Sequence, residues 1–208
     1  MNQMAASNEE RRVHRVLVAR ARKLSAPLVE GIASVGPVSS RREVHPSLGQ
    51  FLAKLIVSQQ LSARAARNIW KRAMFESGNA RMELPAFTEC RPDVVRHCGV
   101  SMNKVRALQS IRAAEMEGLL EEVQGKDLDL PSRISSLLGI RGVGPWTCDM
   151  TLIFYFHMPD IWPEGDTAVQ RTFSKLIGRR SPTRTAQQFS PHRSSLALVM
   201  WHIADAAP

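Results

Sequence analysis

Residues 138–147, Leu-Gly-Ile-Arg-Gly-Val-Gly-Pro-Trp-Thr, constrain the fold of this chain more than any other segment. They predict the end of one helix, a Gly-x-Gly turn at Gly142 and Gly144, and a second helix that begins at Pro145. Glycine reaches backbone angles closed to other residues and leaves no side chain over the turn. The first N–H groups of the second helix can therefore approach a phosphate, whose charge the helix dipole also favours. For this segment taken alone, an ordinary tight turn between two core helices is the alternative.

The rest of the sequence predicts an almost entirely helical chain, because apolar residues recur every three or four positions. Helices are predicted at residues 9–24, 47–57 and 62–75, from a cap at Asn103, from Pro131 into the turn, at 146–156, from a cap at Asp166 to Ile177, and at 194–204. A turn-rich stretch is expected from Gly31 to Pro46. We expect one compact unit over residues 1–208, with an N-terminal helical extension over 1–45 and the hairpin over 133–156.

The charge of the chain favours a polyanionic partner. Lys and Arg number 28 against 19 Asp and Glu, which gives a net charge of +9. No apolar run approaches the roughly 20 residues that span a bilayer, so nucleic acid is favoured over a membrane. The N-terminus has no signal-peptide pattern, with Glu9 and Glu10 in that region. We therefore expect a cytoplasmic protein, associated with the nucleoid if the source is bacterial.

The cysteines, Cys90, Cys98 and Cys148, predict neither a disulfide framework nor a metal centre. Three thiols cannot form a closed set of disulfides, which fits a reducing compartment. Their spacing matches neither the four thiolates of an iron–sulfur cluster nor the paired Cys-x-x-Cys of zinc sites. We expect no iron–sulfur cluster and no transition metal.

Asp166, twenty positions beyond Trp146, is the main candidate for chemistry. It stands where a loop meets a predicted helix, and a carboxylate at an N-cap accepts backbone N–H bonds and feels the positive helix end. Both effects favour the ionised form, which suits a base or an electrostatic stabiliser rather than a general acid. An ordinary capping aspartate is the alternative. Glu164 is the competing carboxylate, and we expect it in the loop and more exposed.

The hairpin and the aspartate together resemble the helix-hairpin-helix–Gly/Pro/Asp superfamily of DNA base-excision glycosylases. The matching segments are residues 57–62, 99–108, 138–147, 165–169 and 190–194, the last followed by Trp201. The resemblance covers residues 45–205. It implies an all-α fold in which two helical lobes flank a substrate cleft. It also implies a monomer whose partner is double-stranded DNA containing damaged bases.

One position indicates which branch of the superfamily the chain resembles. Bifunctional members carry a lysine two residues after the second hairpin glycine, where this chain has Trp146. Without that amine there is no candidate for the Schiff base that precedes strand cleavage. The chain is therefore similar to the 3-methyladenine DNA glycosylase II branch, in a minimal form lacking the N-terminal β domain. This implies a monofunctional enzyme without lyase activity, which flips out alkylated purines such as 3-methyladenine and removes them by hydrolysis in base excision repair.

The resemblance also assigns roles to single residues. Asp166 would stabilise the oxocarbenium-like transition state. Trp146 and Trp201 would stack against the cationic base, with Met150 where the family has a tyrosine. Gln60 would fill the space that the flipped nucleotide leaves. Met102 would act as a wedge on the other strand.

The hairpin itself would hold the DNA backbone. The DNA-contacting residues of this turn would be Gly142, Gly144, Pro145 and Thr147. In the family the turn also chelates a monovalent cation, which here would be Na⁺ or K⁺ on the backbone carbonyls of Leu138, Ile140 and Val143. That ion would be structural, and no other cofactor is expected.

Two alternatives stay open on the sequence alone. One is a glycosylase for a neutral base such as uracil, hypoxanthine or mismatched thymine. Neutral bases are poorer leaving groups and usually need specific hydrogen bonds, which the sequence does not display. The other is a non-catalytic helix-hairpin-helix DNA-binding protein, which would have no use for the carboxylate of Asp166 beside a phosphate-rich surface.

Overall fold

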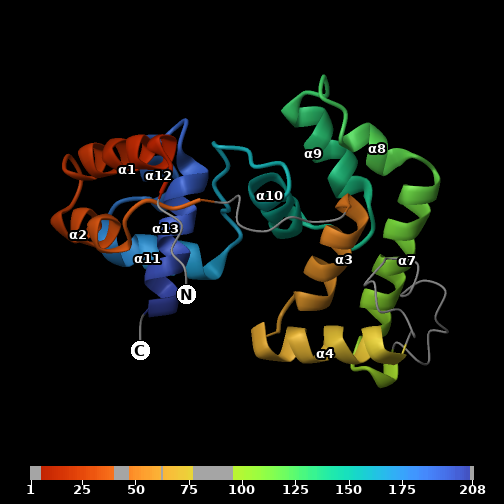
Figure 1. Cartoon of the computed structure of the whole chain (residues 1–208). Coiled ribbons are helices and arrows are strands. Elements are labelled where there is room, and N and C mark those ends of the chain that lie inside the picture. Colours follow the sequence, from red (N-terminus) through yellow and green to blue (C-terminus); the bar gives the residue numbers. More distant parts are fainter. Residues whose placement is uncertain (1–5, 40–46, 62, 77–95, 207–208) are drawn as a thin grey trace. The chain divides into compact units, whose positions relative to one another are not determined.

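The computed structural model describes residues 6–39, 47–61, 63–76 and 96–206, which form α-helices and no strand (Figure 1). The predicted all-α fold is thereby confirmed. Internal contacts group the chain into two compact units, Met1–Val44 with Leu152–Pro208 and His45–Thr151. The sequence predicts one unit over 1–208, and its folding as a single cooperative unit stays a prediction. None of the described helices is long and apolar enough to cross a membrane.

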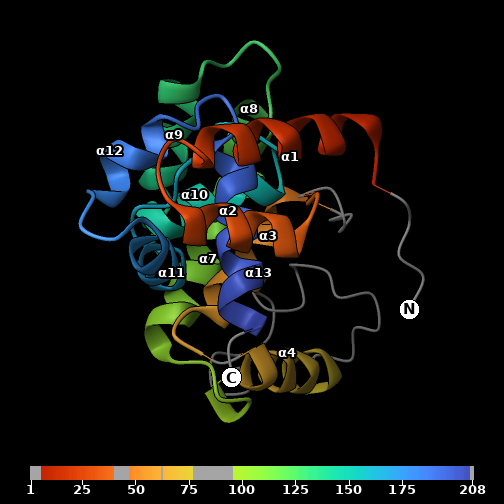
Figure 2. The ribbon, with the colours of Figure 1, turned by 90° about the vertical axis from the view of Figure 1, so that its left-hand side faces the viewer.

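The first unit joins the N-terminal helices to the C-terminal ones. Its helices are α1 (Asn8–Ala21), α2 (Ala26–Val35), α11 (Thr167–Ile177), α12 (Pro182–Gln187) and α13 (Arg193–Ala206). Helix α13 packs against α2 and α11, as Figures 1 and 2 show. Leu28, Ile32, Phe173, Leu196 and Val199 are buried in this core. The N-terminal segment therefore supplies part of the first unit's core.

Helix α2 differs from the sequence-based expectation. A turn-rich stretch is predicted from Gly31, but the helix continues through Gly31 to Val35. A Cβ at Gly31 would lie 3.0 Å from Ile203 Cδ1 and 3.5 Å from Leu176 Cδ1. The glycine thus lies inside a helix, where α2 packs closely on α13 and α11, and not in a turn. The last part of the predicted stretch, residues 40–46, lies outside the described residues.

The second unit carries the hairpin. Its helices are α3 (Leu48–Ser58), α4 (Ala63–Glu76), α7 (Met102–Met116), α8 (Leu119–Val123), α9 (Leu130–Gly139) and α10 (Pro145–Phe154). Helix α3 packs against α4 and α7, and α8 packs against α7 and α9. Leu52, Ile56, Leu108, Ile111 and Leu137 are fully buried among these helices. The boundary between the two units falls inside α10, at Thr151.

Side-chain caps account for the starts of three helices in this unit, α3, α7 and α9. Ser47 caps α3 by accepting a hydrogen bond from the Gln50 N–H, and Asp129 caps α9 in the same way from Ser132. Helix α7 begins one residue before the predicted cap at Asn103, because Ser101 accepts the N–H of Lys104 instead. The short helices α8 and α12 are not predicted by the sequence.

Candidate functional site

The residues that the sequence singles out divide between the two units. The hairpin, Gln60, Met102, Trp146 and Met150 belong to the second unit, and Asp166 and Trp201 belong to the first. The structure thus brings together the proposed DNA-contacting residues in one unit. In the first unit it brings together the proposed catalytic carboxylate of Asp166 and Trp201, one of the two tryptophans predicted to stack on the base.

The hairpin turn depends on Gly142. Helix α9 ends at Gly139, the Val143 N–H donates to the Ile140 carbonyl at 3.0 Å, and α10 begins at Pro145. Gly142 has a φ of +90°, and a Cβ there would lie 2.4 Å from the Cβ of Ala107 in α7. Both the backbone angle and the close approach therefore exclude a side chain.

Gly144 has a different role in the turn. Its φ is not in the left-handed region, and a Cβ built on it meets nothing within 4 Å. Its carbonyl accepts the Cys148 N–H at 2.9 Å, which places Gly144 at the start of α10. Glycine at this position leaves the approach to the first turn of α10 uncovered, where helix N–H groups have no acceptor within the helix.

The other hairpin residues differ in exposure. Pro145 is exposed, whereas Thr147 is only 1% exposed and its hydroxyl accepts a hydrogen bond from Gln59 Nε2 at 2.9 Å. A contact between Thr147 and DNA would therefore use its backbone. Leu138 is exposed, and Ile140 and Val143 are buried.

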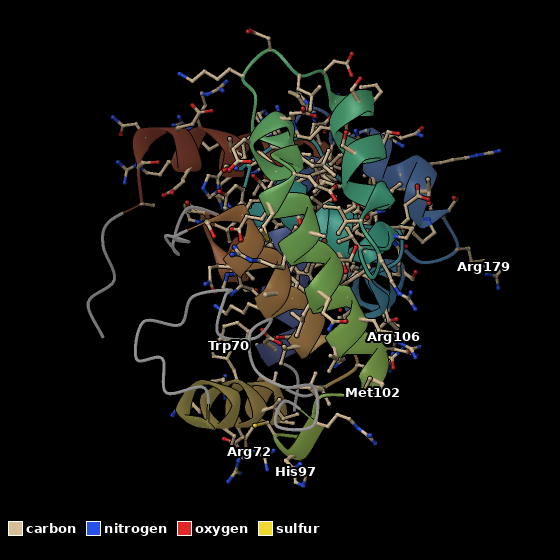
Figure 3. The ribbon with its side chains drawn as sticks, turned by 90° about the vertical axis from the view of Figure 1, so that its right-hand side faces the viewer. Trp70, Arg72, His97, Met102, Arg106 and Arg179 are labelled. Atoms are coloured by element: carbon tan, nitrogen blue, oxygen red, sulfur yellow. The ribbon has the colours of Figure 1, made fainter. Side chains whose placement is uncertain are left out.

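The segments predicted to enter the duplex also lie in the second unit. Gln60 follows α3, is exposed, and has a φ of 57°, which is uncommon for a residue other than glycine. Met102 is the first residue of α7 and is also exposed (Figure 3). Trp146 is half-buried, and Met150 is buried, at 4% exposed. Sequence reasoning did not assign a role to Gln59, although Gln59 joins this segment to the hairpin.

Asp166 in the first unit is the N-cap of α11, as predicted. Its Oδ1 accepts the Val169 N–H at 2.9 Å and the indole Nε1–H of Trp201 at 3.2 Å. The residue is 7% exposed, whereas Glu164 is exposed, as expected. N–H donors directed at a carboxylate stabilise its negative charge. The arrangement therefore holds a buried carboxylate in one orientation.

Trp201 is predicted to stack on the flipped base, and the structure also shows that it donates a hydrogen bond to Asp166. Its ring packs at a tilt against Phe154, with the centroids 5.5 Å apart, while its Nε1 donates to Asp166. The sequence could not show this hydrogen bond, because 35 positions separate the two residues. A partly buried tryptophan with an unassigned N–H is the signal that could have suggested a search for an acceptor.

The beginning of α13 fixes the loop that leads to Asp166. Ser194 Oγ accepts the Ile161 N–H at 2.9 Å and donates to the Met158 carbonyl at 2.6 Å. Arg193 forms an ion pair with Asp160 at 2.8 Å, and Ser190 Oγ donates to the same carboxylate. Burial opposes the charge of Asp160, but the hydrogen bonds from Arg193 and Ser190 outweigh it and lower the pKa of the carboxyl group. Residues 190–194 thus have a supporting role.

The described cysteines do not offer a nucleophile. Cys98 and Cys148 are buried thiols, and Cys90 lies outside the described residues. Burial, and then the charge of Asp149, raise the pKa of Cys148 to about 11. This thiol is therefore protonated at neutral pH. In the part of the chain that the structure describes, no group of three or more His, Cys, Asp or Glu side chains could hold a metal ion.

An all-helical fold with a Gly-x-Gly hairpin and an aspartate at a helix N-cap is the architecture expected of helix-hairpin-helix DNA glycosylases. No protein-family model matches the chain. Among curated proteins, it is 27% identical over 188 residues to DNA-3-methyladenine glycosylase 1 of Schizosaccharomyces pombe, covering 86% of this chain and 82% of that protein. It is 25% identical over 193 residues to the DNA-3-methyladenine glycosylase of Saccharomyces cerevisiae, covering 74% of this chain and 65% of that protein.

Solved structures show the same fold. The DNA-3-methyladenine glycosidase of Bacillus halodurans matches with a TM-score of 0.76 and 24% identity, over 99% of this chain and 94% of that one. The S. pombe 3-methyladenine DNA glycosylase Mag1, solved in complex with abasic DNA, matches with a TM-score of 0.78 and 23% identity, over 94% and 98%. The predicted resemblance to these glycosylases is confirmed in sequence and in fold. The type II branch stays a prediction.

The two hairpin glycines should differ in their effect on stability. Gly142→Ala places a Cβ at a φ of +90° and 2.4 Å from Ala107, so we expect it to lower the free energy of unfolding. Backbone strain and overpacking together predict a loss of about 2–4 kcal/mol. Gly144→Ala meets no neighbour, and we expect a loss below about 1 kcal/mol, from the weaker helix cap. Urea unfolding of both variants measures the difference, and equal stability would contradict the assigned role of Gly142.

Proposed function

We propose that this chain is a monofunctional DNA glycosylase that removes alkylated purines, such as 3-methyladenine, by hydrolysis during base excision repair. The observation that carries the proposal is the buried carboxylate of Asp166, which two N–H donors hold at the start of α11. The names of its relatives, DNA-3-methyladenine glycosylases, support the same activity. A protein that only bound DNA would have no need of a carboxylate held in this way.

The reaction begins when the protein extrudes the damaged nucleotide from the duplex. The first-turn N–H groups of α10, reached past Gly144, contact a backbone phosphate. Exposed Gln60 fills the vacated space in the stack, and exposed Met102 separates bases on the other strand. Contacts of this kind depend little on the surrounding sequence, because they are made mainly to phosphate and to stacked bases.

Bond cleavage follows from charge. An alkylated purine such as 3-methyladenine carries a positive charge, so its bond to the sugar is already weakened and it departs as a neutral base. Positive charge then develops on the sugar, where the Asp166 carboxylate stabilises it. Water adds to the cationic sugar and loses a proton to the surrounding water, which completes the hydrolysis. In this proposal the half-buried indole of Trp146 stacks on the cationic base.

The identity of residue 146 explains why we expect the DNA strand to be left intact. Strand cleavage by a glycosylase needs a primary amine that forms a Schiff base with the sugar. Trp146 occupies the hairpin position that supplies this amine in bifunctional enzymes, and an indole cannot form the adduct. Water is therefore the nucleophile, and the product is an abasic site in an unbroken strand.

We also propose that a monovalent cation binds at the hairpin turn. The proposed ligands are the carbonyls of Leu138, Ile140 and Val143. Leu138 lies in the last turn of α9, where carbonyls lack partners within the helix. The Ile140 carbonyl accepts one hydrogen bond, from Val143, and a carbonyl oxygen has two lone pairs. When bound, Na⁺ or K⁺ would add positive charge beside the phosphate and take no part in bond cleavage.

We further propose that the protein acts as a monomer on double-stranded DNA.

Asp166→Asn tests the proposed chemistry. Asparagine is also a good N-cap residue, so α11 should be retained while the negative charge is lost. We expect base release to be abolished and affinity for DNA to be unchanged or higher, since a repulsion from phosphate is removed. Glu164→Gln, which removes an exposed carboxylate two positions away, is the matched control and should keep its activity. Turnover by the Asn variant near the wild-type rate would remove Asp166 from the catalytic role.

Trp201→Phe separates the two contacts of Trp201. Phenylalanine keeps an aromatic ring beside Phe154 but cannot donate to Asp166. A hydrogen bond to a charged group contributes about 1.5–3 kcal/mol, so we expect the single-turnover rate of base release to fall roughly 10- to 150-fold. Binding of damaged DNA should change little, whereas Trp201→Ala should weaken binding as well. If Trp201→Phe released the base as fast as the wild type and Trp201→Ala released it slowly, Trp201 would act only by stacking on the base.

A further inference from the structure

Two side chains that no motif explains connect the DNA-contacting parts of the second unit. These parts are the hairpin turn, the Gln60 segment after α3, and the beginning of α7 at Met102, which is labelled in Figure 3. The connecting residues are Gln59 and Lys104. Each makes two hydrogen bonds to a different element from the one that carries it.

Gln59 ties the Gln60 segment to the hairpin. Its Nε2 donates to the Gly142 carbonyl at 3.2 Å and to Thr147 Oγ1 at 2.9 Å. Gly142 is the residue at the tip of the turn, and Thr147 lies in the first turn of α10. One amide group therefore contacts both sides of the turn, directly beside the residue proposed to enter the duplex.

Lys104 ties the same segment to α7. Its Nζ donates to the carbonyls of Val57 and Gln59, at 2.8 Å each. These carbonyls lie at the C-terminal end of α3, where a positive charge interacts favourably with the helix dipole. Lys104 is partly buried, and this burial lowers the pKa of its ammonium group. Two of its three N–H donors are thus used inside the protein.

The backbone at Gln60, directly after Gln59, is in an unfavourable conformation. Gln60 has a φ of 57°, and a residue with a Cβ keeps such an angle only where its surroundings hold it. The Gln59 carbonyl accepts a hydrogen bond from Lys104, and the Gln59 side chain donates to the hairpin. The residue directly before Gln60 is therefore held both by α7 and by the hairpin. The close approach of Gly142 to Ala107 joins the hairpin to α7 as well.

We infer that Gln59 and Lys104 are positioning residues that fix Gln60 relative to the hairpin, so that phosphate bound at the hairpin sets where Gln60 enters the duplex. This inference rests on the proposed function, since a plug residue is needed where a nucleotide leaves the stack. Lys104 acts through the protein backbone, and its positive charge is not a phosphate contact. Gln59 acts through the hairpin carbonyl and not through a base.

The test compares two duplexes for each variant: an undamaged one, and one with a tetrahydrofuran abasic analogue next to 2-aminopurine. Lys104→Met removes the ammonium and keeps the apolar stem. Gln59→Glu keeps the shape but places a carboxylate, which cannot donate, against the Gly142 carbonyl. We expect both variants to bind undamaged DNA within about twofold of the wild type. For both variants we expect the affinity for the abasic duplex, relative to the undamaged one, to fall at least about tenfold. We also expect both variants to lose the change in 2-aminopurine fluorescence that the wild type produces on binding.

Arg106→Met is the matched control for loss of a positive charge. Arg106 is exposed on α7, one turn beyond Met102 (Figure 3). Its loss should weaken binding to both duplexes by the same factor and leave the preference unchanged. The inference is overturned if Lys104→Met behaves like Arg106→Met, or if it keeps the wild-type preference. Lys104→Arg, which retains the charged donor, should recover part of the preference.

The double variant tests whether Gln59 and Lys104 act on the same segment. Because both side chains hold one segment, the loss in Lys104→Met with Gln59→Glu should be no more than about twice that of either single change, far below their product. A product of the two losses would show independent effects and contradict the inference. If Lys104→Met unfolds, Gln59→Glu tests the same segment from the hairpin side. The abasic analogue requires no base release, so failure of the wild type to release alkylated bases would overturn the proposed function separately.

Discussion

The second unit depends on the contact between the hairpin turn and α7. Gly142 lies so close to Ala107 that no side chain fits between them, and its φ of +90° suits glycine. This contact sets the position of the α10 N-terminus, whose first-turn N–H groups are the proposed phosphate ligands. It also brings the Gly142 carbonyl within reach of Gln59, and through Gln59 and Lys104 the Gln60 segment is held in place. The residues proposed to bind phosphate and the residue proposed to fill the vacated stack are therefore joined by one set of contacts.

In the first unit a comparable set of contacts surrounds Asp166. The carboxylate is oriented from α11 by Val169 and from α13 by Trp201, while Arg193 and Ser194 hold the loop that precedes it. A catalyst that stabilises developing charge gains most when its groups are already in position, because nothing then has to reorganise during the reaction. The same tryptophan that was predicted to stack on the base thus also orients the carboxylate. Removing the whole indole should therefore disturb both the predicted stacking and the orientation of Asp166, whereas Trp201→Phe removes only the hydrogen bond.

Some features with a local cause were predicted correctly, although the cap of α7 is Ser101 and not Asn103. The caps at Asp166 and the turn at Gly142 follow from short-range hydrogen bonding and backbone angles, which neighbouring residues encode. Features with a distant cause were not. Helix α2 continues through Gly31, where Ile203 and Leu176 pack closely, and these contacts join residues far apart in the sequence. The hydrogen bonds of Lys104 with Val57 and of Trp201 with Asp166 likewise join residues far apart in the sequence.

The most direct test of the central claim is base release from duplexes that each hold a single lesion, followed by analysis of the DNA strand. The account predicts that 3-methyladenine is released faster than uracil, hypoxanthine or mismatched thymine, because a cationic base needs only stacking and one carboxylate. It also predicts that the strand stays unbroken until it is treated with alkali. Faster release of uracil or mismatched thymine would contradict the argument from cationic stacking. A protein–DNA adduct trapped by borohydride would contradict hydrolysis.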